Sequence, residues 1–420
     1  MSRNQKIILG ALVAWHFVLL VLMLTRQLDF LFNDAAHRIG PGSDFWAIYN
    51  AGKHWLRGNE IYGQGPGFGF RYHPILAQTA VALLSTLKQQ WAYWVWVAAC
   101  EILFLSVMAL LRKLCRSTRH FLIIATVLVF FTPYYLEVYM GNASFIAAAL
   151  LLFAFQHYLR GGYRPFFFFY IASILVKPIG LLMLPILLAH RHYKLAVLTI
   201  VIVISLALPY FLSSPEGWHS FRSVNFEGYP TSPGFLVHGG NQGFHALAVR
   251  ISAFAAAIPL TQLFSTGQLS WWNNILIRLI PYLLVLSAVI LTIRLRDPAH
   301  THLLLFIWSA TYLLGYKDVW EHSYCFLIFG LTHLFLSERV DRRLLLVLSA
   351  GLALPTAFAL YDITFYGGGL HDPDWHWNFM TSLIHHLSKP VWLAALFAVA
   401  TLAGYRLRRC DQREVAAGRG

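Results

Sequence analysis

Long blocks of apolar residues, separated by short polar connections, repeat along nearly the whole chain. A helix needs about 20 predominantly apolar residues to cross a membrane, and many of these blocks approach that length. The blocks lie at residues 7–24, 91–111, 121–136, 144–160, 194–212, 272–294, 302–316, 322–336, 343–361 and 390–405. The pattern predicts an all-α, polytopic transmembrane helical bundle of about twelve spans, folded as a single domain over residues 1–420.

One apolar stretch, residues 166–190, does not fit this scheme because the polar sequence VKPIG interrupts it. The stretch is too long for one ordinary span and too short for two complete spans. We therefore predict a pair of short half-spans that meet near Lys177 and Pro178.

The composition agrees with a membrane protein. Of the 420 residues, 58 % are hydrophobic and only 12 % are charged, whereas soluble domains carry roughly 25 % charged residues. Such a chain has too little polar surface to face water on all sides. Transport proteins often contain paired internal repeats, but we find no internal repeat here.

The positive charges predict the orientation of the chain in the membrane. Lys and Arg gather in alternate short connections, as they do in cytoplasmic loops. Both termini are then cytoplasmic, and the protein belongs to the inner (cytoplasmic) membrane. The long connections at 25–73, 213–270 and 362–389 face outward. The net charge of +14 is therefore mainly topological, and no basic patch interleaved with aromatic residues indicates nucleic acid as a partner.

Two stretches of the first outer connection have the pattern of helices that lie at a membrane surface, residues 45–57 and 75–87. The apolar stripe of the first consists of Phe45, Ile48, Tyr49, Trp55 and Leu56. In an interfacial helix such a stripe lies in lipid and the basic side faces the headgroups. We therefore expect membrane lipid as a partner of this region.

Asp44 stands between Gly-Pro-Gly-Ser and the aromatic run that begins the first of these helices. One interpretation is structural: Ser43 or Asp44 caps the helix by accepting backbone amide hydrogens. The other is chemical: a carboxylate at a membrane surface acts as a general base. One carboxylate can fill both roles.

The sequence SDFWAIYNAGKHWLRGNEIY, followed by FRYHPILAQ, resembles the first outer loop of the glycosyltransferase-C (GT-C) superfamily. More narrowly, it is similar to family 87, the bacterial mannosyltransferases that depend on polyprenyl-phosphate-mannose. The positions that match the family pattern are Asp44, Gly58, Tyr62, Tyr72 and Pro74.

Further short similarities follow in the expected order along the chain. They lie in YMGNASF with Asn142, in ILVKPIG with Lys177, in GNQGFHALAVR with Asn241, Gln242 and Arg250, and in DVWEHS with His322. Two positions depart from the pattern, since Gly243 replaces a Ser and Ser323 replaces a second His. The contacts to donor or acceptor at these two positions would differ from those in the family, so the departures bear on whether the sugar is mannose.

The resemblance implies an enzyme with Asp44 as its general base. It would transfer a hexose, mannose in the family, from a polyprenyl-phosphate sugar to a glycolipid or lipid-linked glycan on the outer face, with inversion at the anomeric carbon. No metal and no cofactor are expected.

The remaining polar candidates each have a structural alternative. Lys177 interrupts an apolar stretch, where a charge is costly; it either extends to the interface or captures the donor phosphate. His322 either forms an interfacial hydrogen bond or contacts phosphate or sugar. The polar residues Asn142, Asn241, Gln242 and Arg250 either satisfy ordinary loops or bind substrate, and Tyr62 and Tyr72 join them as substrate-binding candidates from the motif.

Two rival interpretations stay open. The last outer connection contains His371, Asp372, Asp374 and His376 beside two tryptophans; this spacing matches no known metal motif, and a sugar-binding lip is the better reading. The second function class is a transporter or flippase of a lipid-linked sugar, which would place polar groups near the membrane midplane rather than at one face.

Overall fold

The computed structural model describes residues 2–28, 41–62, 69–227, 241–255, 271–316, 319–356, 384 and 387–417. Over these residues the chain is helical, with a single isolated β-bridge between Asn241 and Trp320. The prediction of an all-helical protein is thus confirmed for the described part of the chain.

The helices follow the apolar blocks closely. They are α1 (Arg3–Leu24), α2 (Ser43–Leu56), α3 (Pro74–Gln78), α4 (Ala80–Leu84), α5 (Gln89–Leu114), α6 (Thr118–Val129), α7 (Thr132–Met140), α8 (Ser144–Leu159), α9 (Tyr163–Val176), η2 (Pro178–Met183), α10 (Leu184–Ala189), α11 (Tyr193–Ser213), α12 (Pro215–Arg222), η3 (Ser223–Glu227), α14 (Phe244–Ala255), α16 (Trp271–Arg294), η5 (Pro298–His300), α17 (Thr301–Gly315), η6 (Glu321–Phe326), α18 (Leu327–Ser337), α19 (Arg342–Ala353) and α22 (Pro390–Ala417).

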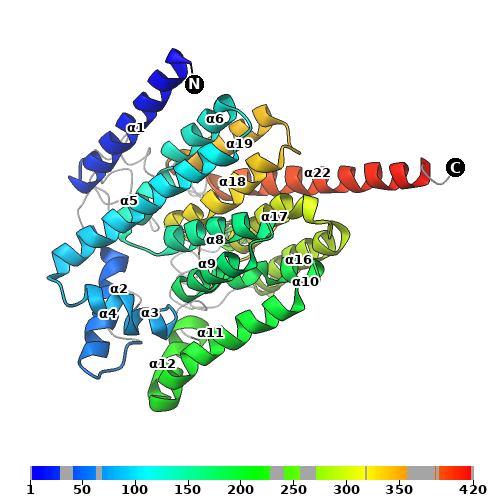
Figure 1. Cartoon of the computed structure of the whole chain (residues 1–420). Helices are drawn as coiled ribbons and strands as arrows, with labels where there is room; N and C mark the ends of the chain where they lie inside the picture. Colours follow the sequence, from blue (N-terminus) through cyan, green and yellow to red (C-terminus); the bar gives the residue numbers. More distant parts are fainter. Residues whose placement is uncertain are drawn as a thin grey trace.

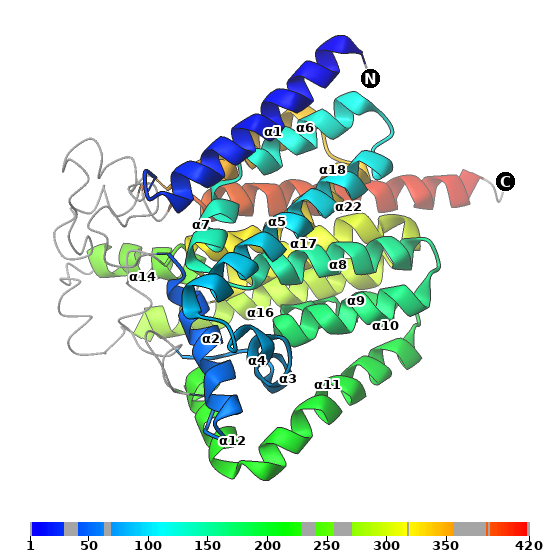
Figure 2. The same cartoon turned by 60° about the vertical axis from the view of Figure 1, so that its left-hand side comes forward.

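The core of the bundle is built on α8, α17 and α18, whose side chains are buried nearly all round. A helix that is apolar on every side is typical of the centre of a bundle. The helices α1, α5 and α6 lie to one side of this centre and α11 lies to the other, while α2 crosses the ends of several helices (Figures 1 and 2). Both termini lie at the end of the bundle opposite α2 and α14 (Figure 2).

Three described helices, α1, α5 and α11, are long and apolar enough to cross a membrane. A fourth span results if α6 and α7 are counted together, although they are bent by 47°. The span expected over 121–136 is therefore broken by a bend. Pro133 lacks a backbone N–H, so it is accommodated in the first turn of a new helix after an extended Phe131.

The break predicted at Lys177 and Pro178 is confirmed. The helix α9 ends at Val176, Lys177 is extended, and Pro178 begins the 3₁₀ helix that leads into α10. The Tyr170 hydroxyl donates a hydrogen bond of 3.0 Å to the Gly180 carbonyl and so holds the second segment against the first.

The helix α2 coincides with the one expected over 45–57, but its apolar stripe is placed differently. Phe45, Ile48 and Tyr49 are fully buried inside the protein, and Phe45 packs against the rings of Tyr93 and Trp96 on α5. Only the end of the stripe, Trp55 and Leu56, is exposed. The expectation that this whole face lies in lipid is therefore wrong, because periodicity identifies an apolar face but not what covers it.

The second stretch, 75–87, also forms helix, but in two pieces. α3 and α4 are separated at Thr79, whose backbone leaves the helical conformation. Ser85 donates a hydrogen bond to the Tyr49 carbonyl (2.7 Å), and Tyr49 donates to the Leu87 carbonyl (2.8 Å). These bonds fasten the segment to the middle of α2.

Candidate active site

The start of α2 positions Asp44. Gly42 is the residue before the helix and has a left-handed conformation (φ +79°), with no side chain capping the helix. The Gly42 amide donates to the Tyr139 carbonyl at the end of α7 (2.7 Å), and the Ser43 hydroxyl donates to the Met140 sulfur (3.2 Å). The prediction that Ser43 or Asp44 is the N-cap is therefore wrong. Asp44 stands in the first turn, where the helix dipole favours a negative charge.

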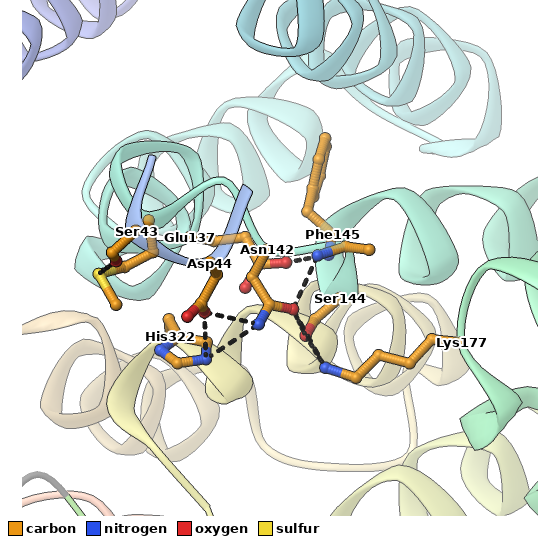
Figure 3. A network of polar contacts seen from close by, with 10 residues as sticks. Ser43, Asp44, Glu137, Asn142, Ser144, Phe145, Lys177 and His322 are labelled. Atoms are coloured by element: carbon orange, nitrogen blue, oxygen red, sulfur yellow. Dashed lines mark hydrogen bonds and ion pairs between the residues drawn. The ribbon is translucent and has the colours of Figure 1, made fainter. Parts of the chain in front are cut away.

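Asn142, in the turn between α7 and α8, contacts the Asp44 carboxylate directly. Its side-chain oxygen accepts hydrogen bonds from the Ala143 amide (2.7 Å), the Ser144 hydroxyl (3.1 Å) and the Lys177 ammonium (3.2 Å). Three donors on that oxygen orient the amide group, so its nitrogen faces the other way. That nitrogen donates to Asp44 Oδ2 at 2.9 Å (Figure 3).

Gly141 makes this arrangement possible. Its φ of +71° is in the left-handed region, and a Cβ atom at this position would collide with Phe45. Only glycine allows the turn to approach α2 this closely.

His322, in η6, lies beside both Asn142 and Asp44. Its Nε2 lies 3.3 Å from the Asn142 side-chain nitrogen and 3.6 Å from Asp44 Oδ2. The His322 side chain is 9 % exposed, whereas that of Asp44 is 25 % exposed. The carboxylate is thus the member of this pair that a substrate can reach.

Lys177 approaches the same asparagine from the opposite side (Figure 3). Besides the bond to Asn142, its ammonium group donates to the Ser144 hydroxyl at 2.6 Å. Asn142 therefore lies between the positive charge and the carboxylate and keeps them from pairing directly. We call Asp44, Asn142, His322 and Lys177 the Asp44 cluster.

Glu137 is a buried carboxylate behind the cluster. Its Oε1 accepts the Phe145 amide at the start of α8 (2.9 Å), and among the described residues its Oε2 has no hydrogen-bond partner. The amides at the start of α8 are thus occupied by Glu137 and Asn142 and not by a ligand. The signal available in the sequence was a carboxylate within an apolar segment, TPYYLEVYM.

Tyr72 lies within electrostatic reach of the cluster. Burial raises the pKa of the Tyr72 phenol, and the Asp44 and Glu137 carboxylates raise it further, while Arg71 lowers it. Tyr62 has a different place, since its hydroxyl donates to the Tyr72 carbonyl (2.9 Å). Tyr62 therefore positions Tyr72 through the backbone.

Asn241 and Gln242 form a second group, whose described hydrogen bonds go mainly to backbone. Asn241 Oδ1 accepts the amides of Gly243 (2.9 Å) and Val319 (3.3 Å). The Gln242 amide donates to the Val319 carbonyl (2.7 Å), and the Tyr324 hydroxyl donates to the Gln242 carbonyl (2.9 Å). We call Asn241, Gln242 and these partners the Asn241 cluster.

The departure at Gly243 has a structural explanation. A Cβ atom there would lie 3.0 Å from Asn241 Oδ1 and 3.4 Å from the Tyr316 carbonyl oxygen. A serine would therefore crowd the Asn241 cluster as this chain builds it. The side chain of Arg250 lies outside the described part of the structure.

Glu321 and Lys389 form a buried ion pair beside His322 that the sequence analysis missed. Lys389 is fully buried, and its ammonium group lies 3.3 Å from Glu321 Oε1. It also donates to the carbonyls of Leu352 (2.8 Å) and Leu354. Because Glu321 precedes His322 in η6, this pair ties the imidazole to the ends of α19 and α22. In the sequence, Lys389 looks like an ordinary residue at the end of a span.

Within the described residues, no three His, Cys, Asp or Glu side chains are grouped so as to hold a metal. The cluster of His371, Asp372, Asp374 and His376 lies outside those residues. Comparison with models of known protein families finds no match, and comparison with curated proteins finds no significant match.

Proposed function

We propose that this protein is an integral membrane glycosyltransferase of the GT-C type, similar to family 87, with Asp44 as its general base. The donor is a polyprenyl-phosphate hexose, mannose in the first instance, and the acceptor is a glycolipid or a lipid-linked glycan. The proposal includes about twelve spans in the cytoplasmic membrane, both termini in the cytoplasm, and transfer on the outer face.

The observation that carries the proposal is the geometry of the Asp44 cluster. Among the described residues, only Oδ2 of Asp44 accepts a hydrogen bond, and the side chain remains 25 % exposed. The other carboxylate oxygen is available to an acceptor hydroxyl. The Lys177 ammonium group lies on the far side of Asn142, so a base and a cation are held apart at the two ends of one amide.

This separation suits the displacement of a phosphate from an anomeric carbon. The acceptor oxygen forms the new bond to that carbon while its proton passes to Asp44. The bond from the carbon to the phosphate oxygen breaks, and polyprenyl phosphate leaves with the electron pair, its added negative charge facing Lys177. A positioned base contributes about 10²–10⁴-fold to such a step, and the bound orientation of the two substrates contributes further.

The lengths of the helices around the cluster favour a lipid-linked donor. α8 has 16 residues and α9 has 14, so they are about 24 and 21 Å long. The hydrocarbon core of a bilayer is about 30 Å thick. If their far ends lie at one interface, the cluster is recessed by about 6–9 Å from the other, at a depth where the phosphate of a membrane-anchored donor can reach it.

The same placement favours an enzyme over a transporter or flippase. The four residues of the Asp44 cluster stand at the start of α2, before α8, after α9 and in the turn of 3₁₀ helix before α18. Alternating access would require polar groups that are reachable in turn from both sides of the membrane.

The test is to incubate the purified protein with polyprenyl-phosphate mannose, glucose and arabinose, each with a lipid-linked glycan acceptor. We expect the release of free polyprenyl phosphate with at least one donor and its loss in Asp44→Asn. The neighbouring variant Ser43→Ala should keep the activity, because among the described residues the Ser43 hydroxyl hydrogen-bonds only to a methionine sulfur. If the protein instead moves a labelled lipid-linked sugar across vesicles without releasing polyprenyl phosphate, the transporter interpretation is correct and this proposal is wrong.

A further inference from the structure

An apolar groove of about 580 Å³ runs between α9 and α11. Phe167, Phe168 and Ile171 line it from α9, and Leu198 and Ile202 line it from α11. Phe168 is 68 % exposed. The helix α11 packs loosely on the bundle, since only 17 % of its 18-residue apolar segment is buried. Figure 2 shows α11 at the edge of the bundle, beyond α9 and α10. The groove therefore lies at the outer surface of the bundle, which faces the hydrocarbon phase if these helices are embedded in a membrane.

One end of this groove is strongly basic. Tyr163 and Arg164 line it directly, and the rings of Tyr163 and His192 are 5.1 Å apart, which brings the starts of α9 and α11 together. Four exposed cations lie within three positions of these two rings along the chain: Arg160, Arg164, Arg191 and Lys194. Within the described part of the chain, none of these four forms an ion pair. Besides their role in orienting the chain, these positive charges are open to an anion from outside the protein.

The basic end lies far from the Asp44 cluster. α9 begins at Tyr163 beside the cations and ends at Val176, directly before Lys177. Its 14 residues separate the two ends by about 21 Å. An anion bound at Arg164 is therefore a different ligand from the phosphate proposed for Lys177.

We propose that this groove is a binding site for an anionic phospholipid of the leaflet opposite the Asp44 cluster. The acyl chains lie between α9 and α11, and the phosphate of the headgroup lies against Arg164 and Lys194. Charge complementarity selects an anionic headgroup, because basic residues at a membrane surface attract anionic lipids. Because apolar side chains line most of the groove, it favours a lipid with acyl chains over a soluble phosphate. The bound lipid fills the space that the loose packing of α11 leaves, and the inference does not depend on the proposed function.

The test is native mass spectrometry of the protein after exchange into mixed micelles with equal amounts of phosphatidylglycerol and phosphatidylcholine. We expect the wild-type protein to retain phosphatidylglycerol. Arg164→Gln/Lys194→Gln should lose roughly 30-fold of that preference, because each cation near an anionic lipid contributes about fivefold. The matched control is Arg339→Gln/Arg343→Gln, which removes the same charge from another exposed connection. The control should retain phosphatidylglycerol as the wild type does.

A second variant tests the apolar part of the site. Ala172 lines the groove, so Ala172→Phe should fill it and reduce lipid retention with every cation in place. Equal retention of both lipids by the wild type, or full retention of phosphatidylglycerol by Arg164→Gln/Lys194→Gln, would overturn the proposal. Displacement of the bound phosphatidylglycerol by polyprenyl-phosphate mannose would also overturn it, because the groove would then belong to the donor.

Discussion

The Asp44 cluster and the Asn241 cluster are both buried groups of polar side chains near one end of the bundle, but they are built differently. In the Asp44 cluster, side chains from four separate segments contact one another, and the carboxylate is partly exposed. In the Asn241 cluster, the described bonds mainly join side chains and backbone of residues 241–243 to backbone and side chains of residues 319–324. The first cluster leaves a carboxylate partly exposed, and the second holds two stretches of chain together.

The difference shows why the chemistry of a polar residue is not enough to assign its role. All these residues have side chains capable of binding a sugar or a phosphate. A side chain whose bonding capacity is used by backbone amides and carbonyls contributes to stability, and leaving those groups unpaired is costly. A side chain held by other side chains, with one oxygen still available, can exchange protons with a substrate. Variants of the two clusters should therefore affect different properties.

The largest effect is expected for Asp44→Asn. The amide can still accept the hydrogen bond from Asn142, so folding should be preserved, but it cannot take a proton. The rate of transfer should fall by about 10²–10⁴-fold, measured as the release of polyprenyl phosphate. Activity close to wild type would show that Asp44 is not the base. The proposed difference between a catalytic Asp44 cluster and a structural Asn241 cluster would then be wrong.

Lys389→Met should act on stability. It leaves Glu321, whose side chain is 13 % exposed, without its counter-charge, and breaking a buried pair costs up to about 3–5 kcal/mol of unfolding free energy. Thermal unfolding in detergent measures the loss. The double variant Glu321→Gln/Lys389→Met should be more stable than Lys389→Met alone, because it no longer buries an unpaired charge; the reverse order would contradict the ion-pair assignment.

Lys177→Met should impair use of the donor more than use of the acceptor. Hydrogen bonds to charged groups contribute about 1.5–3 kcal/mol, so kcat/KM for the donor should fall by roughly 10- to 100-fold. The control is Lys53→Met on α2, whose ammonium group lies over the Tyr49 ring outside the cluster. A change in the KM of the acceptor alone would show that Lys177 does not hold the phosphate.

The smallest effect on turnover is expected for Asn241→Ala. Loss of the two hydrogen bonds to the Gly243 and Val319 amides should lower the unfolding free energy by about 1–3 kcal/mol. Turnover per folded molecule should stay near wild type, measured after correction for the folded fraction. A selective loss of sugar discrimination at unchanged stability would instead place Asn241 in the binding site.

Local patterns in the sequence were sufficient to predict most of the long helices and one of the breaks. The apolar blocks gave the positions of α1, α5, α8 and α11, because a membrane-spanning helix satisfies its backbone hydrogen bonds within itself. The interruption at Lys177 and Pro178 was also predictable from the local sequence. Proline lacks a backbone N–H and its ring clashes with the preceding turn, so it ends a helix. The bend before Pro133 was not predicted, although the same rule applies to it.

The sequence by itself determined that the chain is helical, mostly apolar, and has a carboxylate at the start of an aromatic helix. Only the tertiary structure decided that Asn142 contacts Asp44, which is 98 positions away, and that His322 lies beside it, a further 180 positions along the chain. It also decided that the stripe of α2 packs against α5 and that Lys389 is buried with Glu321. Hydrophobic periodicity is a property of neighbours in the sequence, whereas these contacts depend on which faces of distant helices meet, and on turns such as the one at Gly141 that let them approach.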